Sequence, residues 1–510
     1  MGSSPSGELI IRADASPQIG TGHVMRCLAL AQAWQDAGGT ALFAAASMPP
    51  ALAERLQQEG LSVASLEVQP GSAEDAQQIA ALAQEVSATW VVVDGYSFGA
   101  AYQHTIKGAG LQLLFVDDCG HAEHYWADIV LNQNLHADES LYRDREDYTR
   151  LLLGTRYALL RREFWPWRGW RREIPEVARK VLVTLGGSDP DNQTLKVIQA
   201  LQEVAIDGFE AAVVVGPVNP HFEELESAAD HLPVAIRLVR NVSDMPELMA
   251  WADMAVSASG STCWELALLC TPSLLLVLAD NQEPIAKKLA GLGAAVNLGR
   301  PGFLSPKDIA LALVELATAH GERAAMARCE QELVDGDGAA RVVRQMRAYG
   351  LTLRPVQSHD CRLLWQWAND PQTRAVSFTT EHIPWERHVA WFTTRLADPN
   401  TLFYIACDSA SKPVGQIRYQ MQGQEAVISI SIAPDERGKG YGSQLIQLGA
   451  QAVFSGTPVN VIHAYIRPDN VVSTRAFAAA GFVSNSATEI HSQRACHFVL
   501  HKERHDEQLS

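Results

Sequence analysis

Short apolar runs alternate with longer amphipathic stretches over the first two thirds of the chain. Residues 9–12, 41–44, 90–94 and 113–117 are apolar runs of strand length, separated by stretches with helical spacing. Such alternation predicts a parallel sheet in a doubly wound α/β domain. The pattern stops at the Arg-, Trp- and Pro-rich residues 161–173, which we interpret as a hinge.

A second series of the same kind follows the hinge, and a different pattern follows that. Its strands are expected at residues 180–185, 211–216, 254–257 and 272–278, and it ends near Ala348. From about Leu351 the strand-like runs lie closer together, as in an antiparallel meander, before one strong helix. The fold class is therefore α/β, with two Rossmann-like domains followed by a smaller α+β domain. We place these domains at residues 7–175, 176–348 and 349–505.

Length, charge and apolar content argue against two classes of function, nucleic-acid binding and membrane spanning. The chain has 510 residues, too many for one hydrophobic core, and a formal charge of 41 − 58 = −17. No long run of Lys and Arg offers the basic surface that a nucleic acid needs. The longest apolar stretch, residues 273–279, is far shorter than the ~20 residues that span a bilayer. We expect a cytoplasmic protein that binds small anionic molecules, with no nucleic acid or membrane partner.

The first candidate site is a glycine-rich turn that ends in a histidine. Gly20 and Gly22 permit a tight turn with free backbone N–H groups, and His23 begins the following helix. The positive end of a helix disfavours an imidazolium, so His23 is expected to be neutral and able to take a proton from water. The alternative is a histidine that only packs or caps the helix.

The second α/β domain offers two turns suited to a nucleotide. Gly186, Gly187 and Ser188 close its first strand, where a diphosphate can meet a helix N-terminus. Residues 259–262 (Ser-Gly-Ser-Thr) enter another helix, and Glu265 follows one turn later, where a carboxylate can bind ribose hydroxyls. A capping box made by Ser261 or Thr262 with Glu265 is the open alternative.

A cluster after the strand at residues 113–117 has the residue types of a metal site. It consists of Asp117, Asp118, Cys119, His121 and His124. The spacing fits no familiar zinc pattern, which favours a polar loop lining the cleft and predicts no metal.

A second glycine-rich turn lies in the C-terminal domain. The strand at residues 428–432 leads into Arg437, Gly438, Lys439, Gly440 and Gly442, and an apolar-faced helix follows. This arrangement predicts a cradle for a pyrophosphate, while a strand that splays from its neighbour leaves backbone groups free for an amide-rich arm. A helix N-cap without a ligand is the alternative.

The run R-x-D-x-S-x-x-I-G-x-G-H-x-x-R and the turns described above carry a resemblance. Residues 9–348 resemble the UDP-sugar hydrolases of the pseudaminic acid pathway, which have the GT-B fold. The resemblance implies that His23 activates water against the anomeric carbon, assisted by Tyr96 and with Asp14 in the catalytic set, without a metal. It also implies a set of UDP-sugar contacts: Arg12, Gly20, Gly22, Gly186, Gly187, Ser188, Ser259, Gly260, Ser261, Thr262, Glu265, Asn281 and Gln282.

Residues 351–503 resemble the GNAT N-acetyltransferases, and more narrowly those that act on UDP-linked 4-amino sugars. The motifs are the Arg-x-x-Gly-x-Gly turn, the run Trp-Ala-Asn-Asp-Pro at residues 367–371 and the helix with His388-x-x-Trp391-Phe392. The resemblance implies acetyl-CoA as co-substrate and direct attack of a sugar amine on the thioester. The implied acetyl-CoA contacts are Ile430, Ile432, Arg437, Gly438, Lys439, Gly440, Gly442, Asn470 and Ser473.

One position departs from this second family. Many members carry a tyrosine seven residues after the asparagine, to protonate the leaving thiolate, whereas this chain has Phe477. Another group, water, or no donor at all could serve. Glu425 and His382 are possible bases for the amine.

Together the two resemblances imply a bifunctional enzyme that performs consecutive steps of pseudaminic acid biosynthesis. The C-terminal domain would acetylate N4 of UDP-4-amino-4,6-dideoxy-N-acetyl-altrosamine. The N-terminal pair would hydrolyse the resulting UDP-2,4-diacetamido-2,4,6-trideoxy-altropyranose to UDP and free sugar. The alternatives are a GT-B glycosyltransferase with a differently targeted GNAT domain, or a C-terminal domain that only senses acetyl-CoA. The exact amino sugar and the oligomeric state stay open.

Overall fold

The computed structural model describes residues 6–216, 218–229, 234–240, 242, 244–347, 349–408, 411–438, 441–490 and 493–502. The predicted acetyl-CoA contacts Lys439 and Gly440 lie outside these described residues. The chain divides into two compact units, one that ends at Val343 and one that begins at Arg344. The division falls inside the helix α12 (Gly338–Arg347) and leaves both Rossmann-like domains in the first unit.

The first domain is built on a seven-stranded parallel sheet in the order β3-β2-β1-β4-β5-β6-β7. The strands are β1 (Ser6–Ala13), β2 (Gly39–Ala45), β3 (Ser62–Ser65), β4 (Trp90–Asp94), β5 (Gln112–Val116), β6 (Ile129–Asn132) and β7 (Arg150–Leu153). Its helices are α1 (Gly22–Asp36), α2 (Pro50–Gln58), α3 (Ala73–Glu85) and α4 (Ala100–Gly108). The strand order reverses between β1 and β4, which opens a crevice at their carboxyl ends.

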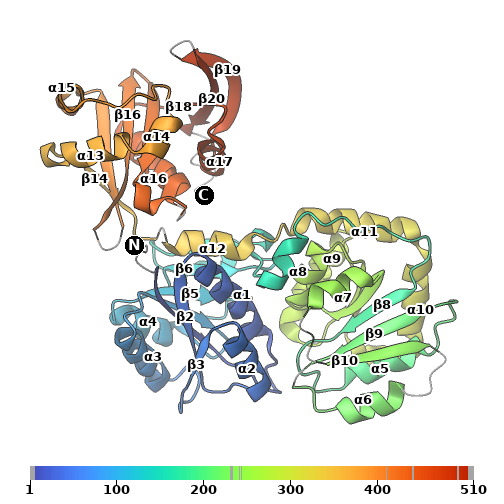
Figure 1. The fold of residues 1–510 in the computed structure, drawn as a ribbon. Coiled ribbons are helices and arrows are strands. Elements are labelled where there is room, and N and C mark those ends of the chain that lie inside the picture. The colour runs from blue at the N-terminus through green and yellow to red at the C-terminus, as the bar shows by residue number, and fades with distance from the viewer. Residues whose placement is uncertain are drawn as a thin grey trace. The chain divides into compact units, whose positions relative to one another are not determined.

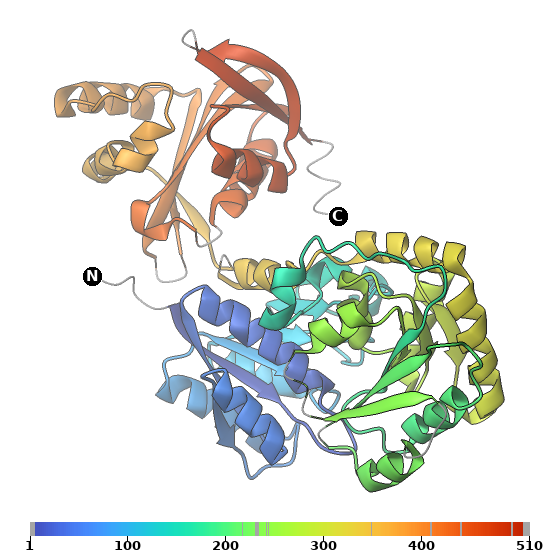
Figure 2. The same cartoon turned by 45° about the vertical axis from the view of Figure 1, so that its right-hand side comes forward.

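The second domain repeats this architecture with six parallel strands in the order β10-β9-β8-β11-β12-β13. The strands are β8 (Lys180–Thr184), β9 (Glu210–Val215), β10 (Ala235–Arg240), β11 (Met254–Ala258), β12 (Ser273–Leu276) and β13 (Val296–Gly299). The helices are α5 (Gln193–Leu201), α6 (Phe222–Ala229), α7 (Met245–Trp251), α8 (Thr262–Leu268), α9 (Glu283–Gly291), α10 (Pro306–Thr318) and α11 (His320–Leu333). Helices flank both parallel sheets (Figure 1 and Figure 2).

The predicted hinge is a packed segment that ties the two domains together. Residues 162–167 form a 3-10 helix, η3 (Arg162–Trp167). Phe164 is fully buried in the apolar core of the second domain. Arg162 donates a hydrogen bond of 2.7 Å from Nη2 to Asp36 at the end of α1. The segment therefore has one anchor on each domain, which restrains their relative position.

The C-terminal unit contains a seven-stranded sheet in the order β14-β15-β16-β17-β18-β20-β19. The strands are β14 (Thr352–Pro355), β15 (Thr401–Cys407), β16 (Pro413–Gln422), β17 (Glu425–Ile432), β18 (Val461–Ile466), β19 (Val483–Ile490) and β20 (Gln493–His501). The helices are α13 (Cys361–Ala368), α14 (Pro371–Ala375), α15 (Trp385–Ala397), α16 (Tyr441–Gly456) and α17 (Val471–Ala479). All neighbouring strands are antiparallel except β17 and β18, which are parallel over three residue pairs.

The apolar and polar positions of this sheet follow its two faces. One face packs on α16 and α17 through a core that includes Ile417, Leu445 and Ile462. The other face meets α13 and α15 through a smaller cluster around Phe392 and Phe403. These two parallel-sheet domains and the antiparallel third sheet confirm the predicted fold class.

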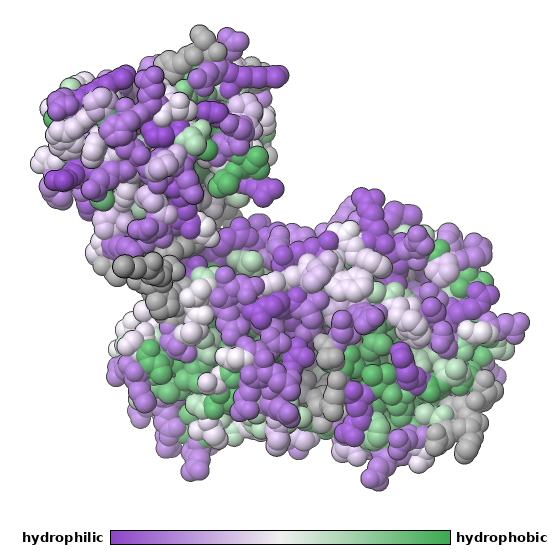
Figure 3. All heavy atoms as spheres, in the orientation of Figure 1, coloured by the Kyte–Doolittle hydropathy of each residue, from purple (hydrophilic) through white to green (hydrophobic). Residues whose placement is uncertain are grey.

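Among the described residues, no helix has both the length and the apolar character needed to cross a bilayer. The face seen in Figure 3 mixes hydrophilic and apolar side chains, and the apolar ones form larger groups in the lower part of the view.

A buried ion pair fixes the end of β1 next to the first crevice. Arg12 has no exposed surface, and its Nε and Nη2 each lie 2.9 Å from an oxygen of Asp75 on α3. Its Nη1 lies 2.8 Å from Asp14, which also accepts the backbone N–H groups of Ala46 and Ser47. Burial alone would lower the pKa of Arg12, but the two carboxylates raise it above its usual value. Arg12 has no surface for a ligand, so it positions the loop instead of contacting a sugar.

We predict that Asp75→Asn destabilises the first domain by about 3–5 kcal/mol, because it leaves the buried Arg12 guanidinium without a full counter-charge. Hydrogen exchange of peptides from β1 to β4 measures this locally. The neighbouring exposed Glu74 gives the control, and Glu74→Gln is expected to stay within about 0.5 kcal/mol of the parent. Unchanged protection of β1 in Asp75→Asn would show that the pair does not hold this strand.

Candidate active sites

His23 lies in the first turn of α1, at the crevice between β1 and β4. Gly20 takes a left-handed conformation with φ of 75° and closes the turn before it. The Nδ1 atom of His23 is 2.6 Å from Oδ1 of Asp94, the last residue of β4. The side chain is 14% exposed, and no described residue bonds its Nε2. An ionised Asp94 fixes the proton on Nδ1, which leaves the Nε2 lone pair free to accept a proton.

Asp94 is the electrostatic centre of this site. Arg26, one turn further along α1, donates to both of its oxygens at 2.6 and 2.7 Å. Burial by itself raises the pKa of the Asp94 carboxyl, but the positive charge of Arg26 and the hydrogen bonds of Arg26 and His23 lower it well below its usual value. Asp94 is therefore a permanent carboxylate that holds the imidazole ring.

The same arginine connects Asp94 to a second carboxylate and a tyrosine. Arg26 Nη1 lies 2.8 Å from Asp118, and Asp118 accepts a hydrogen bond of 2.9 Å from the hydroxyl of Tyr96. Tyr96 stands edge-on to His23 with ring centroids 5.3 Å apart. Burial and the charge of Asp118 raise the Tyr96 pKa above its usual value. Tyr96 is therefore a neutral phenol beside the catalytic candidate.

Tyr96 also bridges the two α/β domains. Its hydroxyl oxygen accepts a hydrogen bond of 2.7 Å from Nδ2 of Asn281, in the 3-10 turn before α9. The two residues are 185 positions apart in the chain. The structure thus brings His23, Tyr96 and Asn281, all expected at the site from the sequence, to one cleft.

The glycine turns of the two domains face each other across this cleft. The position that a Cβ on Gly20 would occupy is 3.7 Å from the Ser188 hydroxyl. A Cβ on Gly187 would overlap the side chain of Thr21, so any larger residue would force the turns apart. Gly186 has φ of 92°, as the tight turn after β8 requires. The two turns expected to contact the UDP-sugar are neighbours in space.

The two helix starts of the second domain differ in their availability to an anion. At α5 the carboxylate of Asp189 accepts the N–H groups of Gln193 and Thr194 at 2.9 and 2.7 Å, so this helix end is already occupied. At α8 no side chain caps the helix, and Ser261 and Thr262 are partly exposed. No side chain therefore occupies the start of α8, unlike the start of α5.

Two residues near α8 have partners that the sequence did not predict. The capping box between Ser261 or Thr262 and Glu265 is not formed. Glu265 instead lies 3.1 Å from Nη2 of Arg161 and is 14% exposed, and burial raises the pKa of its carboxyl although Arg161 opposes the rise. The hydroxyl of Ser259 is buried and donates to Leu276 O at 3.1 Å. The Glu265 carboxylate is thus the ion-pair partner of Arg161, and a bound ribose would have to share this carboxylate with Arg161.

The remaining members of the expected set lie at the rim. A Cβ on Gly260 would be 3.8 Å from Nε2 of Gln282, while Oε1 of Gln282 accepts the Leu278 N–H at 2.9 Å. Gly22 faces open space and is exposed. Gly260, Gln282 and Gly22 therefore leave room next to the cleft.

The loop after β5 holds the residues that resemble a metal site. Possible ligand atoms of Asp117, Cys119 and His121 lie within 4.8 Å of one another. The Asp117 carboxylate, however, already accepts the N–H groups of Cys119, Gly120 and His121 and the hydroxyl of Tyr125. Such a saturated carboxylate organises the turn of a polar loop, as the spacing suggests.

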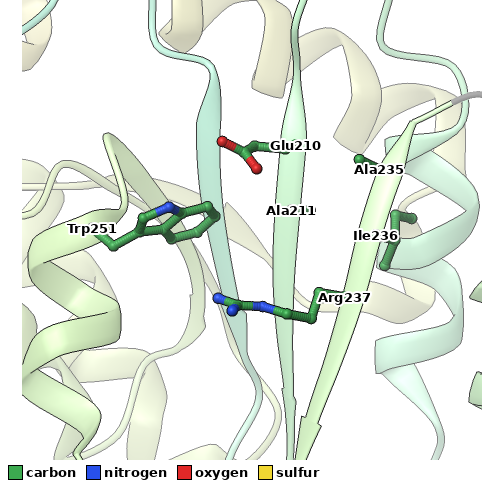
Figure 4. Close-up of a pocket in the computed structure, with 6 residues that line it drawn as sticks. All are labelled: Glu210, Ala211, Ala235, Ile236, Arg237 and Trp251. Carbon is green, nitrogen blue, oxygen red and sulfur yellow. The ribbon is translucent and has the colours of Figure 1, made fainter.

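One cavity of the described residues lies next to the cleft, and another lies away from it. A cavity of about 450 Å³ is lined by His136, Asp280, Glu283, Pro284, Lys287 and Lys288, next to Asn281. A cavity of about 250 Å³ lies between Glu210, Arg237 and Trp251, at the amino ends of β9 and β10 (Figure 4). Ligands of such sheets bind at the carboxyl ends, which favours the first cavity.

The C-terminal glycine turn is held by the short helix α14. Gly438 has φ of 79°. The Arg437 guanidinium donates to Asp370, Thr373 and Gln372 at 2.5, 2.7 and 2.8 Å. Arg437 is 28% exposed, so it joins the turn to α14 and keeps one accessible side. Gly442, in the first turn of α16, lies beside Ala476 of α17.

The remaining residues assigned to acetyl-CoA lie on β17 and at the start of α17. Ile430 and Ile432 pair with β16 on one side and have no pairing with β18 on the other. Asn470 caps α17 by accepting the Ser473 N–H at 3.1 Å. Phe477 is buried 5.0 Å from the ring of Phe482, in the apolar core, and so cannot protonate a thiolate.

Comparison with known proteins agrees with this arrangement. Residues 181–342 match the glycosyltransferase family 28 C-terminal domain, and residues 350–483 match the acetyltransferase (GNAT) domain. An uncharacterized protein of Methanocaldococcus jannaschii is 22% identical over 93% of this chain and 96% of its own length. The UDP-2,4-diacetamido-2,4,6-trideoxy-beta-L-altropyranose hydrolase of Campylobacter jejuni is 26% identical over 57% of this chain and 98% of its own length.

Among solved structures, an aminoglycoside acetyltransferase in complex with coenzyme A is 20% identical and covers 31% of this chain and 99% of its own, with a TM-score of 0.29. The hydrolase relative and the GNAT match confirm the predicted resemblances to a UDP-sugar hydrolase of the pseudaminic acid pathway and to the GNAT acetyltransferases.

Sequence reasoning missed Asp94, Arg26 and Asp118 as members of the first site. A signal was present, because Asp94 and Asp118 directly follow the apolar runs of two adjacent strands. Carboxyl ends of parallel strands share one edge, where polar residues indicate function. Arg26 is the last residue of the glycine-rich motif, yet its partners on β4 and β5 cannot be read from the motif.

We predict that His121 stays an imidazolium well above neutral pH. Burial lowers its pKa, but Asp117 and Cys119 outweigh burial and raise it to about 10. The ion pair between His121 and Asp117 therefore contributes fully to stability below pH ~6.5, the pKa of a free histidine. This contribution is lost as the pH rises through about 10. NMR titration of the His121 ring tests this, and Asp117→Asn should lower the midpoint. A midpoint near ~6.5 in the parent protein would contradict it.

Proposed function

We propose that the chain is a bifunctional enzyme that acts twice on one nucleotide sugar. The unit from Arg344 onward transfers an acetyl group from acetyl-CoA to the 4-amino group of UDP-4-amino-4,6-dideoxy-N-acetyl-altrosamine. The unit that ends at Val343 hydrolyses the product, UDP-2,4-diacetamido-2,4,6-trideoxy-altropyranose, to UDP and the free sugar. The relative from Campylobacter jejuni and the GNAT match support this pair of reactions.

The observation that carries the hydrolase half is the bond between His23 and Asp94. Asp94, kept ionised by Arg26, holds the proton on Nδ1 of His23. Nε2 then accepts a proton from a water molecule as the water oxygen attacks the anomeric carbon. The bond from that carbon to the UDP oxygen breaks, and UDP leaves with the bonding electrons.

The two domains supply different parts of this reaction. The uncapped start of α8 provides backbone N–H groups for the UDP phosphates. Tyr96 and Asn281, one from each domain, meet next to the histidine. This contact limits the room for an acceptor alcohol beside His23, which favours water as the nucleophile.

The acetyltransferase half rests on the free edge of β17 and the glycine turn that follows it. The pantetheine arm pairs with the backbone from Ile428 to Ile432, and the pyrophosphate sits at the turn before α16. The sugar amine attacks the thioester carbon directly, forming the C–N bond as the C–S bond breaks. The buried Phe477 excludes a thiolate proton donor at the usual position.

One rival function has support of its own. The match of residues 181–342 is to a glycosyltransferase family, so transfer of the sugar to an acceptor alcohol is the second candidate. The two functions share the UDP site and differ in the acceptor. Release of UDP and reducing sugar in a mixture without any acceptor alcohol supports hydrolysis and excludes obligate transfer.

One prediction of the proposed function concerns the hydrolytic site. His23→Ala should abolish UDP release, and Asp94→Asn should lower its rate by about 100- to 10,000-fold, because the ring loses its orientation and its counter-charge. Acetyl transfer by the same chains should be unchanged. Retained UDP binding, measured by calorimetry, shows that the first unit is folded. Loss of both activities from well-folded protein would reject two independent sites.

Another prediction of the proposed function concerns the order of the two reactions. Incubation of the full chain with acetyl-CoA and a panel of UDP-4-amino sugars should yield an acetylated nucleotide sugar first and UDP with free diacetamido sugar later, as read by mass spectrometry and NMR. Without acetyl-CoA, UDP release should be slow. Acetyl-CoA binding without acetylation of any amino sugar would favour a sensor over an acetyltransferase.

A further inference from the structure

The pair of parallel strands in the C-terminal unit separates after three residues. Glu425, Ala426 and Val427 on β17 pair with Val461, Ile462 and His463 on β18, and the pairing ends there. Each strand keeps its outer neighbour, because Ser429 pairs with Arg418 on β16 and Tyr465 pairs with His497 on β20. The sheet is therefore split: the first unpaired residues are Ile428 and Ala464, and the next row has Ser429 on one side and Tyr465, paired with His497, on the other.

Four polar side chains gather at this split on one face of the sheet. Residues two apart on a strand, and directly paired residues, share a face, which places Glu425, His463, Tyr465 and His497 together. The opposite face of β18 is apolar and packs on α16. The helices α13 and α15 pack over β15 on the polar face, and His463, Tyr465 and His497 are partly exposed beside them.

One hydrogen bond joins the two histidines, and an ion-pair contact joins one of them to Glu425. Nδ1 of His463 is 2.9 Å from Nε2 of His497. Nε2 of His463 is 3.4 Å from Oε2 of Glu425, an ion-pair distance. A carboxylate there keeps a proton on Nε2 of His463, so Nδ1 accepts from His497 and the lone pair of His497 is on Nδ1. Among the described residues, none bonds that Nδ1 atom.

Packing fixes the ring that carries this lone pair. His497 stacks on Tyr465 with ring centroids 4.8 Å apart and on His463 at 5.2 Å. Burial and the nearby His463 lower the pKa of His497 below its usual value. Charged groups on this face include Glu425, Arg418 on β16, Arg395 and Asp398, which contact Gln420 on β16, and Arg467, which is paired with Asp469. The ring is thus a neutral base at neutral pH.

We propose that Nδ1 of His497, oriented by His463 and Glu425, takes the proton from the sugar ammonium that the acetyltransferase unit acetylates. This inference deepens the proposed function and rests on it. His497 is the catalytic residue, since it touches the reacting nitrogen, while His463 and Glu425 are positioning residues. The location suits the task, because a thioester whose arm runs back along β17 from the glycine turn ends at the split.

The chemistry balances without any further reactant. His497 removes one proton from the R–NH₃⁺ group and passes it to solvent, which leaves a neutral amine. The nitrogen lone pair forms a bond to the thioester carbon, the C–S bond breaks, and the sulfur leaves with that electron pair. The second proton lost by the nitrogen ends on the sulfur, which gives an amide and free thiol.

The test measures acetyl transfer by the full-length chain as a function of pH, with acetyl-CoA and the best UDP-4-amino sugar. We expect His497→Gln to lower kcat about 100-fold near neutral pH with little change in the KM for acetyl-CoA. The loss should shrink as pH rises, because the amine then loses its proton to solvent. Glu425→Gln should shift the acidic limb of kcat/KM to lower pH, since the imidazolium loses a negative neighbour.

Controls separate this inference from simpler explanations. His501, exposed on the same strand, gives the matched variant His501→Gln, which should behave like the parent. Calorimetric binding of acetyl-CoA shows whether each variant is folded, and Glu425→Gln decides the question if His497→Gln does not bind. If the acidic limb of the kcat/KM profile is unchanged in both His497→Gln and Glu425→Gln, the assignment of His497 is wrong. Loss of that limb in His382→Gln instead would also overturn it. A parent chain that acetylates no amine contradicts the proposed function itself.

Discussion

The first site depends on one buried carboxylate that serves two cations. Asp94 ends the central strand β4 and is bonded at once to Nδ1 of His23 and to the guanidinium of Arg26. Its charge survives burial only because Arg26 is buried with it. The imidazole is therefore oriented by a group that neither titrates near neutral pH nor moves, which is what a base at the bottom of a crevice requires.

The doubly wound topology explains why these groups meet. Strand order reverses between β1 and β4, so the loop after β1 and the end of β4 border the same crevice. The helix that follows the loop carries His23 and Arg26 three residues apart, on one face. Across the crevice, Asn281 reaches Tyr96 from the second domain, and the packed segment around Phe164 restrains the approach.

In the C-terminal unit, the proposed site depends on strand pairing instead of on a buried charge. Its reactive region exists because β17 and β18 stop pairing after Val427 and His463. The unpaired edge leaves backbone groups for an extended ligand, and Tyr465 and His497 lie beside it on the polar face of the sheet. In both units, the proposed site lies where regular strand pairing ends and polar side chains gather.

Local patterns predicted much of this molecule. The alternation of apolar runs predicted both parallel sheets and the antiparallel third sheet, and the turns at Gly20 and Gly438 have the left-handed conformation that glycine permits. These features depend on residues close in the chain, where spacing and backbone sterics decide the outcome. The histidine of the first turn and the departure at Phe477 were likewise evident from the motifs.

The sequence by itself determined the folds, the two glycine turns and the position of His23. Only the tertiary structure decided which charge neutralises which. Arg12, Glu265 and Arg437 all looked like ligand contacts, yet their partners include Asp75, Arg161 and Asp370, each from a distant segment. The physical reason is that a buried charge must find a counter-charge, and the pattern of one segment cannot tell which other segment the fold brings beside it.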